Sequence, residues 1–191
     1  MISEKSRIRK IFAEKRANMS LTDVDAKSKQ IKIHLLALPE YQKSISIHTF
    51  IGSLPGEVRT KPLIEHALSE NKKVMLPIYH GVDKPPSHSI IHNLDSLEMT
   101  QFGIEQPTEE SVIPSEAHNA GIILVPCIAV DKSGNRIGMG GGFYDRILDQ
   151  LSMTKIALAF DFQFIDSLPA EEHDIKINIV VTEEGVTRIK E

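Results

Sequence analysis

A ten-residue segment near position 140, RIGMGGGFYD, combines a basic residue, a glycine cluster and an acid. Glycine occupies four of the five positions from 138 to 142, between Arg136 and Asp145. Because glycine has no side chain, successive backbone N–H groups in such a segment can converge on one oxyanion. A helix expected from about Phe143 would add its positive N-terminal end, and Arg136 would add a full charge. These features suit the binding of a phosphate group.

Two common phosphate-binding motifs do not fit this segment. A Walker A loop requires G-x-x-x-x-G-K-[ST], and no lysine followed by serine or threonine is present here. A dinucleotide fingerprint requires G-x-G-x-x-G directly after a strand, whereas the hydrophilic residues DKSGNR come just before these glycines. Two interpretations stay open on composition: an anion-binding nest, or a glycine-rich hairpin or lid without a ligand.

Other charged residues offer related chemistry, each beside a plainer explanation. Asp145 in a first helical turn either compensates the helix dipole or, beside a phosphate, holds Mg²⁺, which takes one or two carboxylates plus phosphate oxygens. Asp174, in the acidic segment EEHD, fits a solvated turn or a second carboxylate ligand. Lys5 and Arg9 share a helix face, either solvated or facing an anion. Glu57 follows an apolar segment and is either a loop acid or a ligand contact.

Bulk composition excludes several functional classes. The chain has 191 residues and a formal net charge of −4, which is unfavourable for binding nucleic acid or an anionic membrane surface. Cys127 is the only cysteine, so an intramolecular disulfide is impossible and a core position is expected. The charged N-terminus lacks the apolar core of a signal peptide, and no apolar run approaches about 18 residues. We therefore expect a cytoplasmic protein.

The elements that must position these residues alternate between helix and strand. Helical periodicity is expected to about Ala17, from an N-cap at Ser20 to before Pro39, and after an N-cap at Thr60. Strands are expected in SISIHTFIGS, KKVMLPIY, AGIILVPCIAV, KIALAFDF and INIVVTEE, with GVTRIK forming an edge hairpin through Gly185. The segment from about position 90 to 117 is expected to mix a short strand with loops.

The apolar run from Ala120 to Val130 is typical of a strand buried on both faces of a parallel sheet. The alternating order predicts an α/β fold: a single-domain three-layer sandwich over residues 1–191, with a mostly parallel central sheet, Rossmann-like. Ligands in such folds bind beyond the carboxyl ends of the strands, and the glycine loop follows the most apolar strand.

Four colinear segments, together spanning nearly the whole chain, resemble the 5-formyltetrahydrofolate cyclo-ligase family. KSRIR is similar to the family's N-terminal K-x-x-[LI]-R, and GEVRT followed by PLI resembles its G-E-v-x-T loop and helix. VPCIAVDKSGNRIGMGGGFYDRIL is similar to its long signature, which is specific, and LPAEEHDIKIN resembles its L-P-x-E-x-h-D element. The chain departs from the pattern at Met139 and Gly141, where members often carry a basic residue, and at Asn178, where some carry an acid.

The resemblance implies an enzyme that uses ATP and Mg²⁺ to convert 5-formyltetrahydrofolate into 5,10-methenyltetrahydrofolate, ADP and phosphate. The formyl oxygen would be phosphorylated and N10 would then attack the formyl carbon. It also implies a small-molecule folate substrate, polyglutamylated forms included, and we expect a monomer without nucleic-acid or membrane partners.

Carried over by motif, two residue sets are implied. The ATP contacts would be Lys5, Ser6, Arg7, Ile8, Arg9, Arg136, Ile137, Gly138, Met139, Gly140, Gly141, Gly142, Phe143 and Tyr144. The folate contacts would be Arg9, Phe50, Glu57, Met139, Gly140, Gly141, Gly142 and Phe143. Asp145 and Asp174 would bind Mg²⁺. Arg136 and Glu57 are the catalytic candidates, Arg136 neutralising phosphate charge and Glu57 orienting the pterin or formyl end.

Two other functions stay open at this point. A related α/β protein could bind a different phosphorylated metabolite, such as a sugar phosphate or a coenzyme A thioester, without needing a folate. A non-catalytic regulator could retain the fold and bind nucleotide or folate without turnover.

Overall fold

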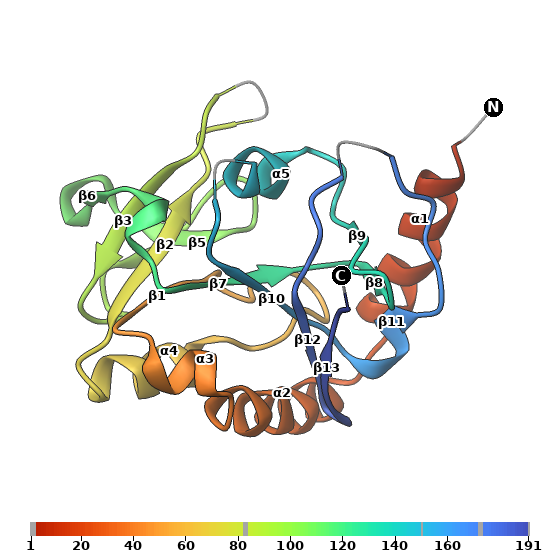
Figure 1. The fold of residues 1–191 in the computed structure, drawn as a ribbon. Helices are drawn as coiled ribbons and strands as arrows, with labels where there is room; N and C mark the ends of the chain where they lie inside the picture. The colour runs from red at the N-terminus through yellow and green to blue at the C-terminus, as the bar shows by residue number, and fades with distance from the viewer. Residues whose placement is uncertain (1–2, 82–83, 150, 172–173, 191) are drawn as a thin grey trace.

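The computed structural model describes residues 3–81, 84–149, 151–171 and 174–190, and within them one large sheet organises the fold (Figure 1). Eight strands of the described residues form this sheet. In spatial order they are β13 (Gly185–Arg188), β12 (Ile179–Thr182), β10 (Thr154–Leu158), β7 (Ile122–Pro126), β1 (Ser46–His48), β2 (Lys73–Ile78), β3 (Ser87–Ile91) and β6 (Ile113–Ser115). The strands from β12 to β2 pair in parallel, and β13, β3 and β6 add antiparallel edges.

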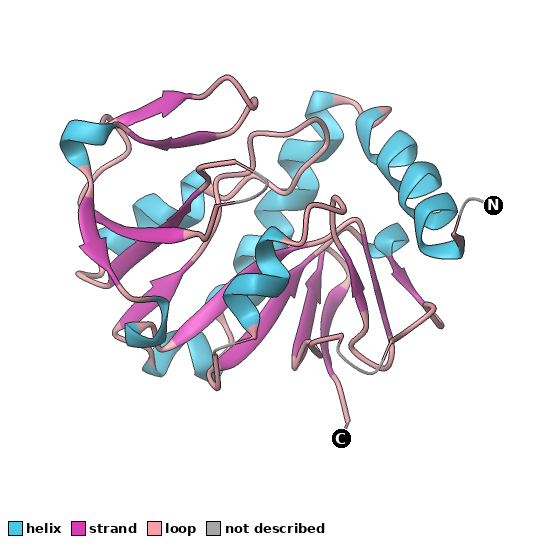
Figure 2. Cartoon of the chain, turned by 90° about the horizontal axis from the view of Figure 1, so that it is seen from above, coloured by secondary structure: helices cyan, strands magenta, loops and turns pink. Residues whose placement is uncertain are grey.

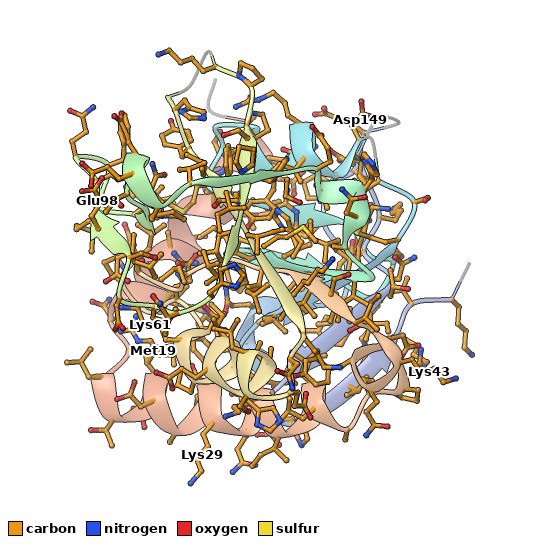
Figure 3. The ribbon with its side chains drawn as sticks, turned by 90° about the vertical axis from the view of Figure 1, so that its left-hand side faces the viewer. Met19, Lys29, Lys43, Lys61, Glu98 and Asp149 are labelled. Carbon is orange, nitrogen blue, oxygen red and sulfur yellow. The ribbon has the colours of Figure 1, made fainter. Side chains whose placement is uncertain are left out.

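Helices cover both faces of the large sheet. They are α1 (Glu4–Ala17), α2 (Leu21–Leu36), α3 (Pro39–Lys43), α4 (Lys61–Ser69) and α5 (Phe143–Leu148). The helices α2, α3 and α4 lie on one face and α5 lies on the other (Figure 1). Figure 3 shows the same layers from the side, with Lys29 pointing outward from α2 and Asp149 lying beyond α5. This arrangement confirms the predicted three-layer α/β fold with a mostly parallel sheet.

Alternation along β7 explains the most apolar run of the sequence. Ile122 and Leu124 pack in a core cluster with residues of α2 and α4. Ile123 and Val125 pack in a second cluster, with Ile147 of α5. Since successive residues of a strand point to opposite faces, a strand covered on both sides must be apolar at every position.

The predicted single strand from Ala120 to Val130 was wrong in extent. After β7 the chain leaves the large sheet at Pro126, and the carbonyls of Cys127 and Ile128 accept hydrogen bonds from Gln163 Nε2 at 2.9 and 3.0 Å. The chain then enters a smaller sheet made of β11 (Phe164–Ile165), β8 (Ala129–Asp131) and β9 (Arg136–Ile137). An apolar run alone therefore did not reveal where the strand broke.

Most other predicted elements are confirmed, with shorter bounds. The Ser20 hydroxyl accepts from Asp23 N at 3.0 Å and begins α2, as expected of an N-cap. Thr60 occupies the N-cap position of α4, but its hydroxyl instead accepts from Gly52 N at 3.1 Å and donates to the Phe50 carbonyl. Thr60 thus fixes the loop after β1 instead of capping the helix.

The middle of the chain has more strand than expected. Besides β3 and β6 it contains the hairpin β4 (Leu97–Met99) and β5 (Glu105–Pro107), visible as a separate two-stranded ribbon in Figure 2. In the described part of the chain, three single turns of 3₁₀ helix connect elements: η1 (Glu109–Ser111), η2 (Ala117–Asn119) and η3 (Asp161–Gln163). No helix among the described residues is long and apolar enough to cross a membrane.

Candidate active site

A cavity of about 400 Å³ lies where the carboxyl ends of β1, β2 and β7 meet the glycine loop. The loop after β1 contributes Phe50 and Glu57, the residue after β2 contributes Tyr79, and the end of β7 contributes Pro126 and Cys127. The segment 138–145 lines the opposite side. The site therefore occupies the edge of the parallel sheet at which ligands bind in this class of fold, as predicted.

An aromatic cluster forms one wall of this cavity. Tyr79 contacts Phe102 and Phe143 edge to face, with ring centroids 4.9 and 5.2 Å apart. Phe143 contacts Tyr144 in the same way at 5.7 Å. Such a wall suits a flat, largely apolar ring system. Tyr79 and Phe102 were not among the predicted site residues; the only signal was that Tyr79 is the last residue of a predicted strand.

A tight turn places the glycine loop over the cavity. Asp131 Oδ1 accepts from the backbone N–H groups of Ser133 and Asn135 at 2.9 and 2.8 Å, which closes the turn between β8 and β9. β9 pairs with β8, so the chain re-emerges beside the cavity directly after Ile137. Gly142 then adopts φ of +63°, a left-handed conformation that favours glycine, and α5 begins at the next residue.

The helix that follows the glycines is short. It covers six residues, Phe143–Leu148, so a macrodipole contributes less than a long helix would. The first N–H groups of any helix still lack intrahelical partners, and here they directly follow the loop. An anion at this position would depend mainly on backbone N–H groups and on neighbouring cationic side chains.

Arg136 supplies one of these cations from beneath the loop. Its Nη1 donates to the Pro126 carbonyl at 3.2 Å, and its Nη2 forms an ion pair with Asp145. The Arg136 side chain is 4% exposed, whereas that of Asp145 is 65% exposed. The guanidinium carbon also lies 6.0 Å from the centre of the Tyr144 ring. Arg136 is therefore held rigidly against the cavity, and Asp145 reaches solvent at its mouth.

Helix α1 brings one cation to the glycine loop and another to the C-terminal acidic segment. Arg9 Nε donates to the Gly138 carbonyl at 2.8 Å. Lys5 Nζ, one turn earlier on α1, contacts Asp174 at 2.8 Å and Glu171 at 3.4 Å. The basic face of α1 thus faces the glycine loop and the C-terminal acidic segment, so a purely solvated face is excluded. Glu172 and His173 of that segment lie outside the described residues.

The remaining predicted ATP contacts of α1 and β9 differ in their surroundings. Ile8 and Ile137 pack in one small hydrophobic cluster with Ile128 and Leu168. Ser6 donates and accepts hydrogen bonds only locally in the contacts seen here, with Ser3 at the start of α1, and Arg7 is exposed. None of these residues, Ile137 included, lines the cavity within the described part of the chain, so the structure does not bring them into the site.

Glu57 is a buried carboxylate at the cavity floor. Glu57 is 7% exposed, and burial raises the pKa of its carboxyl group above the ordinary value. Opposing that shift, Arg16 Nη1 lies 3.8 Å from Glu57 Oε1, and Leu54 N donates to Oε2 at 3.3 Å. Arg16 was not among the residues predicted from the sequence.

The surroundings of Cys127 and Asn178 explain two features noted in the sequence. Cys127 is buried and burial raises the pKa of its thiol to about 12, which fits the predicted core role and opposes a nucleophilic one. Asn178 Oδ1 accepts from Lys155 N at 2.8 Å, so this departure from the family pattern links β10 to the segment before β12.

The acidic residues suit a magnesium ion better than a structural metal. Within the described residues, no group of three or more His, Cys, Asp or Glu side chains is arranged to hold a metal. Asp145 instead pairs with Arg136, and Asp174 shares Lys5 with Glu171. Mg²⁺ commonly takes one or two protein carboxylates and completes its shell with phosphate oxygens and water. The donor set therefore fits Mg²⁺ that arrives with a phosphorylated ligand.

The sequence is similar to those of one enzyme family. Residues 1–183 match the sequence profile of the 5-formyltetrahydrofolate cyclo-ligase family. A Haemophilus influenzae 5-formyltetrahydrofolate cyclo-ligase is 34% identical over 179 residues, covering 91% of this chain and 92% of that relative. A Mus musculus protein of the same name is 30% identical over 195 residues, covering 95% and 90%.

Solved structures show the same fold. The Aquifex aeolicus 5,10-methenyltetrahydrofolate synthetase has a TM-score of 0.86 and 32% sequence identity, over 99% of this chain and 94% of that one. A Mycoplasma pneumoniae 5,10-methenyltetrahydrofolate synthetase has a TM-score of 0.75 at 21% identity, over 95% and 99%.

Proposed function

The chain belongs to the 5-formyltetrahydrofolate cyclo-ligase family, and we propose that it converts 5-formyltetrahydrofolate into 5,10-methenyltetrahydrofolate while ATP is cleaved to ADP and phosphate. The observation that carries the proposal is one cavity that joins an aromatic wall and a buried Glu57 to a glycine loop backed by Arg136. The first two features suit a pterin, and the last two suit a triphosphate.

Each side of the cavity has a proposed role. Phe50, Glu57 and Phe143 hold the folate, and Glu57 accepts N–H groups of the pterin. The loop from Gly138 to Gly142 forms the boundary between folate and ATP. Lys5 and Arg9 on α1, together with Arg136, contribute positive charge to the phosphates.

The reaction requires positioning more than covalent participation by the protein. The γ-phosphoryl group passes to the formyl oxygen, which converts a poor leaving group into phosphate. N10 of the same folate attacks the formyl carbon and loses its proton, and the carbon–oxygen bond then breaks to release phosphate. Because the ring closure is intramolecular, the substrate supplies most of the proximity and the cavity maintains its orientation. Arg136 stabilises charge that develops on the transferred phosphoryl group.

Asp145 and Asp174 are the proposed holders of Mg²⁺, which when bound neutralises phosphate charge. Without ligand, each carboxylate is paired with a cation that is itself proposed to contact phosphate: Asp145 with Arg136, and Asp174 with Lys5. Exchange of partners on binding would keep every charge paired. We further propose that the chain works as a cytoplasmic monomer, as one domain, and accepts polyglutamylated folate.

A turnover assay tests the proposed function. Purified protein, 5-formyltetrahydrofolate, ATP and Mg²⁺ should together produce the absorbance of 5,10-methenyltetrahydrofolate, and omission of ATP should abolish the signal. The absence of product with all components present would refute the proposal. Ligand-induced thermal stabilisation by ATP and folate without turnover would indicate a non-catalytic binder instead.

Gly141→Ala should raise the KM for ATP about tenfold and leave the thermal unfolding temperature unchanged. A Cβ at Gly141 meets no atom within 4 Å, so the protein itself does not require glycine there. A phosphate bound close to the backbone would require it, because a methyl group would hold the ligand away. Steady-state kinetics and thermal unfolding are the measurements.

Gly142→Ala is the matched comparison, because φ of +63° strains alanine and should lower stability by about 1 kcal/mol. An unchanged KM for ATP in Gly141→Ala would contradict close approach of a phosphate to this loop.

Asp145→Ala should weaken activation by Mg²⁺ about tenfold, with the fold retained. The Asp145 side chain is 65% exposed, and Arg136 retains its hydrogen bond to the Pro126 carbonyl, so the fold should survive loss of the ion pair. The midpoint of a Mg²⁺ titration at fixed ATP is the measurement. Asp149→Ala, which replaces an exposed aspartate at the end of the same helix, is the control and should leave that midpoint unchanged. An identical Mg²⁺ titration for Asp145→Ala and the unmodified protein would remove the metal role from Asp145.

A further inference from the structure

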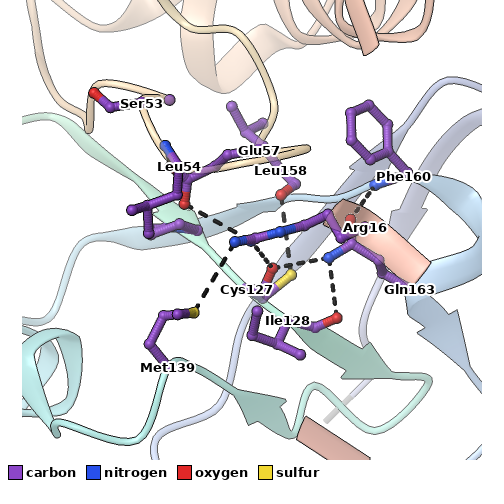
Figure 4. A network of polar contacts seen from close by, with 12 residues as sticks. Arg16, Ser53, Leu54, Glu57, Cys127, Ile128, Met139, Leu158, Phe160 and Gln163 are labelled. Atoms are coloured by element: carbon purple, nitrogen blue, oxygen red, sulfur yellow. Dashed lines mark hydrogen bonds and ion pairs between the residues drawn. The ribbon is translucent and has the colours of Figure 1, made fainter. Parts of the chain in front are cut away.

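A buried arginine that the proposed mechanism does not use lies at the floor of the cavity. Arg16 belongs to the last turn of α1, and its residue is 4% exposed. Its side chain points to the place where the loop after β1, the end of β7 and the glycine loop converge (Figure 4). An arginine is seldom fully buried unless it is paired, so its contacts decide what it does.

Those contacts leave the guanidinium incompletely paired. Nη1 lies 3.8 Å from Glu57 Oε1 and 3.4 Å from the Cys127 carbonyl, and Nη2 lies 4.0 Å from Met139 Sδ. A charge-assisted bond in a tight arginine–carboxylate pair is roughly 2.7–2.9 Å long. Arg16 Nε and the Tyr144 hydroxyl are buried and have no hydrogen-bond partner among the described residues. Arg16 is thus close enough to influence Glu57 electrostatically without consuming the acceptor capacity of its carboxylate.

The backbone locks Arg16 and Glu57 next to each other. Gly56, the residue before Glu57, packs so closely on α1 that an added Cβ would lie 1.8 Å from the Arg16 carbonyl oxygen. Gly56 also has φ of +62°, so a larger residue is disfavoured by conformation as well as by space. The loop that carries Glu57 therefore rests directly on the turn that carries Arg16.

The positive charge of Arg16 affects the protonation of Glu57. Burial raises the pKa of Glu57, and Arg16 is the strongest influence that lowers it, ahead of Leu54 N–H and Arg59. A protonated Glu57 would lose one acceptor and present an O–H group to the ligand. A neutral residue at position 16 would therefore favour the form of Glu57 that binds N–H donors less well.

We propose that Arg16 is a positioning residue for folate binding: it holds Glu57 as a carboxylate at the cavity floor, with oxygens free to accept N–H groups of the pterin. The Arg16 side chain also contacts Met139 of the glycine loop, so the same buried cation lies beside both the proposed folate site and the loop. This inference rests on the proposed function and adds a residue that acts through Glu57, without assigning it contact with the reacting atoms.

A double-mutant cycle tests the proposal. The variants are Arg16→Met, Glu57→Gln and the double variant, with Kd for 5-formyltetrahydrofolate measured by equilibrium titration and KM measured for folate and ATP separately. Arg16→Met should raise Kd and KM for folate about thirtyfold, the loss expected when hydrogen bonds from the pterin to a charged Glu57 are weakened, and change KM for ATP less than threefold. In the Glu57→Gln background the same change should raise Kd less than threefold.

Two further variants separate a positioning role from a structural one. Arg16→Lys retains the charge and should recover most of the lost folate affinity, even if Arg16→Met folds poorly. Arg188→Met removes an exposed arginine that pairs with Glu40 and should leave every constant unchanged. Thermal unfolding monitors the folded fraction of each variant.

The possible outcomes are distinguishable. Equal losses from Arg16→Met in both backgrounds would show that Arg16 acts independently of Glu57 and would overturn the proposal. So would an Arg16→Lys variant that is folded but as weak as Arg16→Met. A parent protein that neither binds 5-formyltetrahydrofolate nor forms product would refute the proposed function, and this inference with it.

Discussion

Arg136→Met should lower kcat/KM for ATP about a thousandfold while the protein remains folded. Arg136 is a buried cation that the Pro126 carbonyl and Asp145 hold beside the glycine loop. A preorganised donor in a water-poor site needs no reorganisation during phosphoryl transfer, and loss of one such group typically costs 10²- to 10³-fold or more. Methionine retains most of the volume between Pro126 and Tyr144 but removes the charge.

Two variants calibrate that result. Arg136→Lys retains a positive charge but cannot bridge Pro126 and Asp145 with a planar guanidinium group. Its activity should therefore lie between that of Arg136→Met and that of the unmodified protein. Arg188→Met, in an exposed pair with Glu40, should match the unmodified protein. Steady-state kinetics with varied ATP is the measurement. A loss of less than tenfold in Arg136→Met would mean that Arg136 has a structural role only.

Glu57→Gln should raise KM for 5-formyltetrahydrofolate about a hundredfold and leave KM for ATP nearly unchanged. The amide has nearly the same shape, but one acceptor oxygen becomes a donor that opposes a pterin N–H group. A site built to pair a buried polar group strongly rejects a mismatched partner. Glu40→Gln, far from the cavity at the start of α3, is the control. Equal KM values for folate in Glu57→Gln and the parent protein would exclude Glu57 from the folate site.

The same variant has an expected signature in stability. Because the pKa of Glu57 is raised in the folded protein, the unfolded chain releases this proton more readily, and stability declines as pH rises above about 4.5, the ordinary value. Glu57→Gln lacks that decline. The stability of the variant relative to the parent should therefore increase with pH, up to the folded-state pKa of Glu57. Denaturant unfolding at several pH values checks this sign, and a constant difference would contradict it.

The sequence predicted most of the fold because local patterns and the global fold agree. The fully apolar residues of β7 are required by a strand that is covered on both faces, and Ser20 caps α2 as its type and position predicted. The break at Pro126 was missed because the apolar run continues from one sheet into another. The predicted N-cap at Thr60 was wrong because its hydroxyl bonds to the backbone of the loop after β1. A local sequence pattern does not contain that contact.

The site was predictable where its residues lie close together in sequence. Arg136, the glycines and Asp145 form one segment, and the structure places that segment at the cavity. Arg16 was missed because its burial depends on the contact between Gly56 and the end of α1, which joins distant parts of the chain. Phe102 was missed for a similar reason, since only the β4–β5 hairpin brings it to Tyr79.

We propose that, in this cavity, a phosphoryl group passes from ATP to the formyl oxygen of a folate. The most direct measurement is a reaction of 5-formyltetrahydrofolate carrying ¹⁸O in its formyl group, followed by mass spectrometry of the released inorganic phosphate. We predict that each phosphate contains one ¹⁸O atom, because the carbon–oxygen bond breaks after the oxygen has been phosphorylated. Unlabelled phosphate accompanied by 5,10-methenyltetrahydrofolate would contradict the account.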